Sequence, residues 1–355
     1  QLAPPTPPDQ GKCPGQRSFG RGAEPRNGPI SLVCHQRACS WPIAPPMGRA
    51  GIGQVGRAPR CIREAPPAGH LRSTSVWVSG VEFPAELVDA HRAGRLVLFV
   101  GAGASRDEPA GLPDFKALTR SIAGEAHYEV AESDLDHPDV VLGRIEDRGV
   151  DIHLRVAEHL SIPESKHNRL HEAVVDLALT APTLRLVTTN FDRHLTSAIE
   201  ARGAEVEEYA APALPMGDNF AGLVYLHGTL RQPPQRLVVT DGDFGKAYLR
   251  DAWAARFLER MFAEFSVLFI GYSHGDVVMR YLARALGPDG QRYVLTDTPG
   301  ERDWKDLGLR PIGYEVVDNS HAALGHSLGR WAEIAGMGLL DHRQRVAELV
   351  ASPPS

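Results

Sequence analysis

The sequence predicts an α/β fold, a doubly wound and mostly parallel sheet with helices on both faces and a small helical insertion. Short apolar runs rich in β-branched residues alternate with longer segments of helical periodicity, as in a parallel sheet covered on both sides. Small and polar residues follow the C-terminal ends of these runs, where open parallel sheets bind ligands. The 355 residues, 43% of them hydrophobic, suffice for one large domain or two ordinary ones.

The first 75 residues differ in composition from the rest of the chain. They hold 13 of the 28 prolines, and ten Lys and Arg against three Asp and Glu, a net charge of +7. Such a segment cannot bury enough apolar surface to offset the entropy cost of ordering. We therefore predict a disordered tail over 1–75 and a folded domain over 76–355. The four cysteines all lie in the tail, at Cys13, Cys34, Cys39 and Cys61. None forms a C-x-x-C pair, so we expect no metal and no zinc module.

Charge and hydropathy narrow the class of protein further. Because the whole chain has a net charge of −6, the residues after the tail carry −13, which argues against direct nucleic-acid binding as their main role. No segment approaches the ~20 consecutive apolar residues of a membrane span. The first ten residues lack the apolar core of a secretion signal. We expect a cytoplasmic protein with no membrane partner.

The strands are predicted from short runs of apolar and β-branched residues. The run at 95–100 is continuously apolar after its first residue, which is typical of a strand buried on both faces. The run at 266–270 has the same character. Strands are expected at 95–100, 184–189, 222–226, 236–240, 266–270, 291–296 and 314–317.

The helices are predicted from apolar residues that recur on one face. Pro84 suits the first turn of the first helix, and the segment 251–265 is strongly amphipathic. Helices are expected at 83–92, 116–126, 165–180, 192–202, 251–265, 276–286 and 326–351. Residues 120–180 form the predicted helical insertion. The C-terminal helical segment is expected to be interrupted near Gly336 and Gly338.

Five short motifs follow strands or open helices in the predicted sheet. They are GAGAS at 101–105, GLPDF at 111–115, TTNFD at 188–192, LHG at 226–228 and GYSHGD at 271–276. Small residues at 101–105 allow a backbone to approach a bulky anionic ligand, although a tight strand connection has the same composition. Because the carboxyl ends of parallel strands meet at one edge of a sheet, we expect these motifs to lie together.

In this order and spacing the motifs resemble the sirtuin-like NAD-binding domain, which has a Rossmann-like sheet. The resemblance covers roughly residues 90–320 and is closest to the prokaryotic sirtuin-like NADases of anti-phage defence systems. Protein deacylases of the family carry a four-cysteine zinc module after the catalytic histidine, and this part of the chain has no cysteine. Thr189 and Lys116 also stand where deacylases usually have Gln and Arg.

The resemblance implies a role for each matching residue. Gly101, Ala102, Gly103 and Ser105 would hold the pyrophosphate of NAD, with bare backbone N–H groups as donors. Asp114 and Phe115 would close over the nicotinamide ribose, and an Asp before a helix is as readily a cap. Gly271 and Ser273 would form a second phosphate- and ribose-binding turn, and Asp297 would meet the adenosine ribose. His274 is expected at a helix entry and Asp276 at an N-cap.

Asn190 and His227 are the predicted catalytic residues. The family motif places Asn190 against the ribose hydroxyls and the attacking water, and an amide can donate and accept at once. His227, with a pKa near ~6.5, would accept a proton from a ribose hydroxyl or from water. Asp192 is implied to contact the nicotinamide carboxamide, and it also suits an N-cap. His167 and His171 are four residues apart without a third ligand, so no metal site is predicted.

The implied reaction is hydrolysis of NAD, the substrate, to nicotinamide and ADP-ribose by a triggered NAD-depleting effector. We expect homo-oligomers and a separate sensor or activating partner, for which family analogy suggests a helicase-type translocase ATPase or a short Argonaute. A deacylase without the zinc module and a non-catalytic NAD sensor remain alternatives. The acceptor, water or an acylated lysine, distinguishes the first two.

Overall fold

The computed structural model describes residues 75–273, 290–318, 320–338 and 340–344. These residues belong to one unit, Ala68–Ser355, by the clustering of their contacts. The tail predicted over 1–75, apart from its last residue, lies outside the described residues. The same holds for the helix expected at 276–286, for His274 and Asp276, and for the chain after 344.

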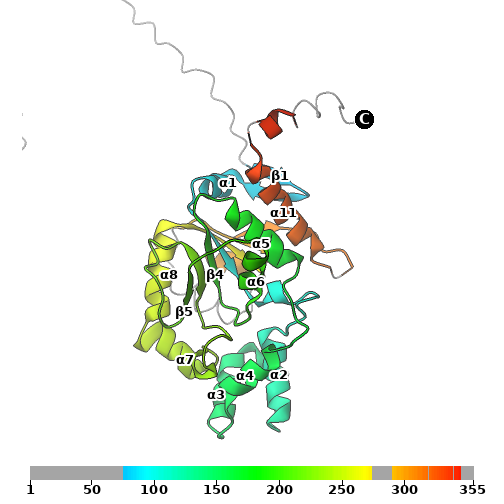
Figure 1. Ribbon diagram of the computed structural model, residues 1–355. Helices are drawn as coiled ribbons and strands as arrows, with labels where there is room; N and C mark the ends of the chain where they lie inside the picture. The colour runs from blue at the N-terminus through cyan, green and yellow to red at the C-terminus, as the bar shows by residue number, and fades with distance from the viewer. Residues whose placement is uncertain (1–74, 274–289, 319, 339, 345–355) are drawn as a thin grey trace, which may run out of the picture. The chain divides into compact units, whose positions relative to one another are not determined.

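Seven strands form a sheet in the order β5-β6-β4-β3-β7-β8-β9 (Figure 1). Their bounds are β3 Leu96–Val100, β4 Arg185–Thr188, β5 Glu208–Ala210, β6 Gly222–Tyr225, β7 Ser266–Ile270, β8 Arg292–Thr296 and β9 Arg310–Gly313. Every neighbouring pair is parallel, which confirms the predicted α/β fold. β3 pairs with β4 on one side and with β7 on the other, so the chain winds outward in both directions from β3. This switch point is where such sheets bind ligands.

Helices cover both faces of the sheet because alternate residues of each strand point to opposite sides. One face packs against α1 Ala85–Arg92, α5 Arg169–Leu179, α6 His194–Ala201 and α11 Ala322–Gly336. The other packs against α7 Asp241–Gly245, α8 Trp253–Glu264 and α10 Arg302–Asp306. In β3, for example, Leu98 belongs to the first core and Val97 and Phe99 to the second.

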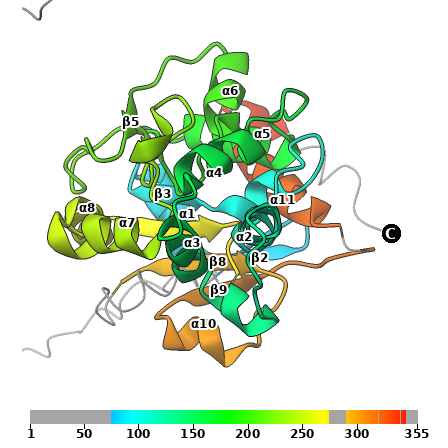
Figure 2. The ribbon, with the colours of Figure 1, turned by 90° about the horizontal axis from the view of Figure 1, so that it is seen from below.

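A third apolar cluster lies beyond the carboxyl edge of the sheet, in the region of the predicted insertion (Figures 1 and 2). It is formed by α2 Phe115–Glu125, α3 Pro138–Glu146 and α4 Ile152–Leu160, together with Leu237 and Val239. A short 3-10 turn, η2 Glu132–Asp136, precedes α3. α5, placed at the end of the predicted insertion, instead packs on α11 against the sheet.

Two predicted strands were wrong. In the segment at 236–240, Arg236 is the exposed last residue of a 3-10 turn, η3 Pro234–Arg236, and residues 237–240 are buried but outside the sheet. The apolar residues of this segment fill the second and third cores, so their composition reflects burial and not strand pairing. The strand expected at 314–317 is β9, four residues earlier. β9 includes Pro311, which an edge strand tolerates because one side needs no backbone donor.

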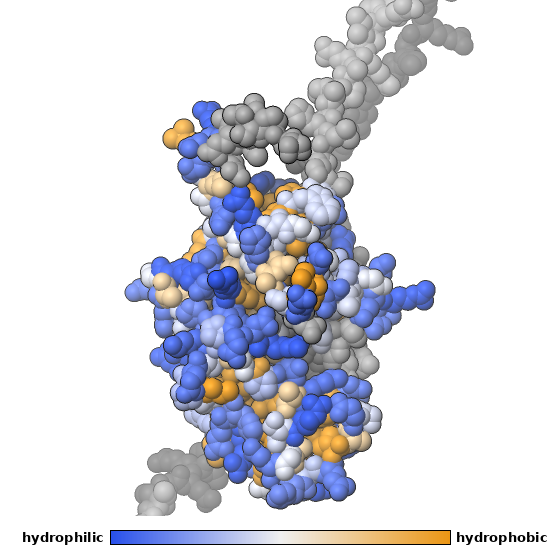
Figure 3. Space-filling view, turned by 90° about the vertical axis from the view of Figure 1, so that its right-hand side faces the viewer, coloured by the Kyte–Doolittle hydropathy of each residue, from blue (hydrophilic) through white to orange (hydrophobic). Residues whose placement is uncertain are grey.

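Other elements carried too little sequence signal to be predicted. A hairpin of β1 Ser75–Val78 and β2 Val81–Pro84 precedes α1, which therefore begins two residues later than expected. β5 has only three residues, and α7 continues into a π-type turn, η4 Lys246–Arg250. None of the described helices is long and apolar enough to cross a membrane. On the face drawn in Figure 3, apolar residues are scattered among hydrophilic ones.

Candidate functional site

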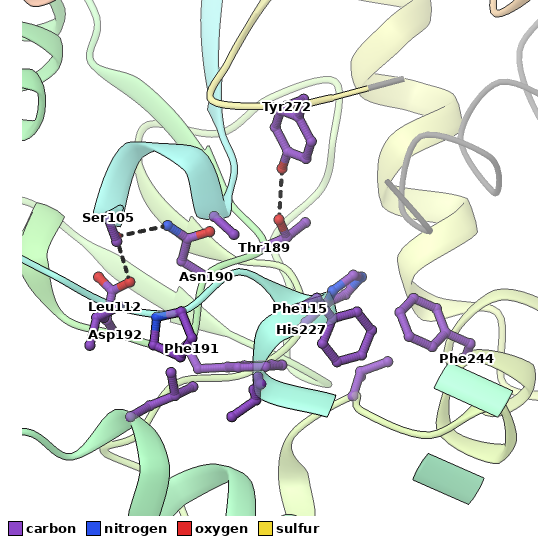
Figure 4. Close-up of a pocket in the computed structure, with 15 residues that line it drawn as sticks. Ser105, Leu112, Phe115, Thr189, Asn190, Phe191, Asp192, His227, Phe244 and Tyr272 are labelled. Carbon is purple, nitrogen blue, oxygen red and sulfur yellow. Dashed lines mark hydrogen bonds between the residues drawn. The ribbon is translucent and has the colours of Figure 1, made fainter. Parts of the chain in front are cut away.

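Two adjoining hollows lie at the carboxyl edge of the sheet, around the ends of β3, β4, β6 and β7. The first is lined by residues of the predicted motifs and by aromatic side chains, among them Ser105, Phe115, Asn190, Asp192, His227, Phe244 and Tyr272 (Figure 4). The second is lined by Gly103, Arg106, Asp114, Lys116, Gly271, Ser273, Asp297 and Tyr314, among others. Ala102, Phe115 and Tyr272 line both hollows and so form the wall between them. Every predicted site residue except Gly101 lines one hollow or the other.

The glycine turn is closely joined to the end of β7. Gly101 N donates to Ile270 O at 2.9 Å, and Gly103 N donates to Gly271 O at 3.0 Å. The sequence predicted bare N–H groups in this turn. At Gly101 and Gly103 they are not bare, because backbone carbonyl oxygens already accept from them. Gly271 has a φ of +73°, and a Cβ there would lie 2.6 Å from Ala104 N. Only glycine fits such a position without strain.

Tyr272, which sequence reasoning missed, lies over the start of this turn. A Cβ at Gly101 would come within 2.6–2.7 Å of the Tyr272 ring, so Gly101 makes room for an aromatic ring. The Tyr272 hydroxyl donates to Val100 O at 3.2 Å and pairs with Thr189 Oγ1 at 2.7 Å. The Tyr272 ring is thus anchored to the last residue of β3 and to the residue that follows β4.

Asn190 follows β4 and is buried, with a side chain that points into the first hollow. Its Nδ2 donates to Gly101 O at 3.1 Å and to Ser105 Oγ at 3.2 Å. Its Oδ1 is buried and has no hydrogen-bond partner in the protein. In Figure 4 the nitrogen faces Ser105 and the oxygen faces away from it. A buried acceptor without a partner is costly, which makes this oxygen a candidate ligand contact.

Asp192 links the first hollow to the start of α6. Its Oδ1 accepts from His194 N at 3.0 Å, and its Oδ2 accepts from Ser105 Oγ at 2.8 Å. Ser105 Oγ also lies 3.2 Å from His171 Nε2. Both carboxylate oxygens therefore accept hydrogen bonds from the protein. The bond from His194 N lies at the start of α6, close to the N-cap role that the sequence also suggested.

His227 differs from its sequence expectation. The ring is only 2% exposed, and Nε2 lies 2.8 Å from the Tyr248 hydroxyl. Phe244 packs edge-on against it, with ring centroids 5.2 Å apart. Burial lowers the pKa of His227 to about 3, so the expectation of an ordinary pKa was wrong and the ring is neutral at pH 7.

The second hollow contains the remaining predicted residues. Asp114 caps α2, with Oδ1 accepting from Ala117 N at 2.8 Å, so the capping alternative holds. Asp297 faces this hollow together with Tyr314. Burial, followed by the nearby carboxylates of Asp297 and Asp107, raises the pKa of Tyr314 to about 12.

Some of the site residues missed by sequence reasoning left a signal. Thr189 lies in the motif TTNFD and Tyr272 in the motif GYSHGD, whereas the sequence suggested His171 only as a possible metal ligand. Within the described part of the chain, no group of three or more His, Cys, Asp or Glu side chains is placed to bind a metal. Phe244 and Tyr248 come from α7 and η4, which the sequence did not predict.

Comparison with known proteins finds a matching family model and a similar relative. Residues 184–312 match the family model of the SIR2-like domain, in agreement with the sirtuin-like resemblance of the motifs. The chain is 28% identical over 312 residues to the uncharacterized protein y4cA of Sinorhizobium fredii (strain NBRC 101917 / NGR234). That alignment covers 78% of this chain and 26% of the relative, so the chain spans about a quarter of the relative's length.

A solved structure from work on the structural basis for the mechanism and regulation of Sir2 enzymes is also similar. It is 16% identical, with a TM-score of 0.38, and the alignment covers 74% of this chain and 96% of that chain.

Proposed function

We propose that this domain hydrolyses the nicotinamide–ribose bond of NAD and releases nicotinamide and ADP-ribose. The observation that carries the proposal is the buried, unpartnered Oδ1 of Asn190 in a two-part crevice at the switch point of the sheet. The nicotinamide riboside would occupy the first hollow, among Phe115 and Phe244. The adenosine half would occupy the second, near Gly271, Ser273 and Asp297.

The chemistry needs little more than orientation. The water oxygen bonds to C1′ of the ribose as the C1′–N bond breaks. The electron pair of the C1′–N bond passes to the nicotinamide ring, and one proton of the water is released to solvent. Because the leaving group is a cationic pyridinium, no strong acid is required. Asn190 Oδ1 would accept from the attacking water or a ribose hydroxyl. Neutral His227 would accept a hydrogen bond from a ribose hydroxyl.

The test is to incubate the purified protein with NAD and to separate nicotinamide and ADP-ribose by chromatography. Asn190→Ala should lower the turnover number by about 10²-fold, since a pre-positioned polar group is lost. Asn219, an exposed asparagine, provides the control, and Asn219→Ala should retain wild-type turnover. Equal rates for Asn190→Ala and wild type would refute the assignment.

A second candidate is NAD binding without turnover, which the pKa of about 3 at His227 favours because such a ring is a weak base. Tight NAD binding with no nicotinamide released, in any oligomeric state, would identify this case. Release of nicotinamide only with an acylated peptide would identify a deacylase instead.

We further propose that the hydrolase acts as a triggered effector of anti-phage defence in the cytoplasm, as a homo-oligomer with a separate sensor or translocase ATPase. The resemblance of the motifs to defence-associated NADases supports this role. In cells, expression of the wild type during phage infection should deplete NAD, and Asn190→Ala should not. Unchanged NAD levels with an active wild-type enzyme would contradict the defence role alone.

A further inference from the structure

We propose that Ser105, Asp192 and His171 are positioning residues that fix the side-chain amide of Asn190 with its carbonyl oxygen toward the substrate. The inference rests on the proposed function of Asn190 and deepens it. It follows from the direction of each hydrogen bond in a buried network.

The hydrogen bonds of His171 show which of its ring nitrogens carries the proton. Nδ1 accepts from the backbone N–H of Asn168 at 3.1 Å, so in a neutral ring the proton is on Nε2. Burial lowers the pKa of His171 to about 3, which keeps the ring neutral at pH 7. Nε2–H therefore donates to Ser105 Oγ at 3.2 Å.

The direction of the Ser105 hydroxyl is set by Asp192. The hydroxyl of Ser105 donates to Asp192 Oδ2 at 2.8 Å, and the carboxylate oxygen accepts. The oxygen of Ser105 then offers its lone pairs to His171 and to Asn190. Asp192 cannot turn away, because its other oxygen accepts from His194 N.

The amide of Asn190 consequently meets two acceptors on one side. Gly101 O is always an acceptor, and Ser105 Oγ has its proton directed elsewhere. A flipped amide would place Oδ1 against both of these oxygens and lose two hydrogen bonds. The network therefore allows one orientation, in which Oδ1 is the atom left for a ligand.

The sharpest variant is Asp192→Asn, which keeps the shape of the side chain but leaves only one acceptor for two donors. We expect it to lower kcat for NAD hydrolysis by about 10²-fold with KM changed less than about threefold, since the amide of Asn190 is no longer held. Ser105→Ala should act in the same direction. Ser327→Ala, which removes another buried hydroxyl in α11, should retain wild-type values.

His171 allows a rescue test. His171→Gln can still donate to Ser105 and should remain within about fivefold of wild type, whereas His171→Leu should lose activity as Ser105→Ala does. Equal loss in both His171 variants, or a change in KM alone for Asp192→Asn, would overturn the inference. Should Asp192→Asn not fold, Ser105→Ala and the His171 pair decide it.

A readout independent of turnover separates this inference from the proposed function. The Asn190 side-chain amide, assigned in ¹⁵N NMR spectra by its loss in Asn190→Ala, should exchange slowly with solvent in the wild type. Its exchange should accelerate about 10-fold or more in Ser105→Ala and Asp192→Asn, and not in Ser327→Ala. Inactive wild type with this pattern refutes only the hydrolase, and unchanged exchange refutes the positioning network.

Discussion

The shape of the site depends on two glycines at which two segments of backbone come into close contact. Two glycines, Gly103 and Gly271, let the turn after β3 and the end of β7 meet within hydrogen-bond distance. A Cβ at Gly103 would lie 2.9 Å from Gly271 O, a backbone atom that cannot rotate away. The sequence therefore carries glycine here for close packing of two strand ends, whatever ligand the crevice holds.

Gly103→Ala should lower the free energy of unfolding by about 1–3 kcal/mol, because one strand end must move to accept the methyl group. Gly124 provides the matched control, since it lies in α2 with no atom within 4 Å of an added Cβ. Gly124→Ala should raise stability by about 0.5–1 kcal/mol. Urea unfolding of both variants measures the difference, and a Gly103→Ala protein as stable as wild type would contradict the packing argument.

Residues of the site were predictable where they follow strands in chain order. Ser105, Asn190 and Asp192 each come within five residues of the end of an apolar run, so strand prediction places them at one edge. His171 was not predictable as part of the site, because its contact with Ser105 spans 66 residues and depends on how α5 packs. The low pKa of His227 was also out of reach, since it follows from burial beneath α7.

At the scale of elements, a buried ion pair connects the helical insertion to α7. His153 Nε2 in α4 lies 2.7 Å from Asp243 Oδ2, and His153 Nδ1 lies 3.4 Å from Glu146 Oε1. The hydrogen bond with Asp243 raises the pKa of His153 against the effect of burial. Burial alone would raise the pKa of Asp243, but His153 and the Thr240 backbone lower it to about 2.

The pair should stabilise the protein most between about pH 4 and pH 6.5. The His153 contribution is complete below the unfolded pKa of about 6.5 and is lost as pH rises through the higher folded value. The Asp243 contribution is complete above about pH 4 and is lost as pH falls toward 2. Asp243→Asn should therefore cost about 2 kcal/mol of unfolding free energy at pH 6, and less at pH 8.5.

Urea unfolding at both pH values measures this dependence. Asp306, an exposed aspartate of α10, is the control, and Asp306→Asn should have the same small effect at each pH. A cost for Asp243→Asn that is equal at pH 6 and pH 8.5 would show that the charge on His153 does not matter.

Elements were predictable where local composition and tertiary role agree. The strands at the centre of the sheet are apolar on both faces, and α8 has a clear apolar stripe. The run after Arg236 was read as a strand because its composition records burial, and a sequence does not say against which partner a segment is buried. β5 is too short for any periodicity to be visible.

For the whole molecule, buried neutral histidines predict sensitivity to acid. The pKa values of His171 and His227 are lowered to about 3 by burial, and burial also lowers those of His91 and His194. The unfolded chain binds protons at His171 and His227 below about pH 6.5, and the folded protein does not until the pH approaches 3. Stability is therefore complete above pH 6.5 and is lost as pH falls toward 3.

Each such histidine contributes a slope of up to about 1.4 kcal/mol per pH unit. His171 and His227 together should lower the free energy of unfolding by about 2–3 kcal/mol between pH 6 and pH 5. Urea unfolding at pH 7, 6 and 5 measures the slope. Unchanged stability over this range would show that both rings accept protons in the folded protein.

The overall fold was the most predictable level, because alternation of strands and helices and the position of polar residues depend on local sequence. Strand order was not, since nothing local distinguishes a neighbour across the switch point from a distant strand. The motif resemblance predicted a sirtuin-like domain, and the match of residues 184–312 to the SIR2-like domain agrees with it.

The Tyr272 ring between the two hollows has a kinetic consequence. On the proposed function, nicotinamide would bind on one side of the ring, whereas the dinucleotide would extend past it along Ala102 and Phe115, which line both hollows. On the proposed function, the observed association rate of NAD should level off at high concentration, because the displacement of the ring becomes rate-limiting. That of nicotinamide should stay linear. Stopped-flow fluorescence would record both rates, and a linear dependence for NAD would show that the wall does not delay entry.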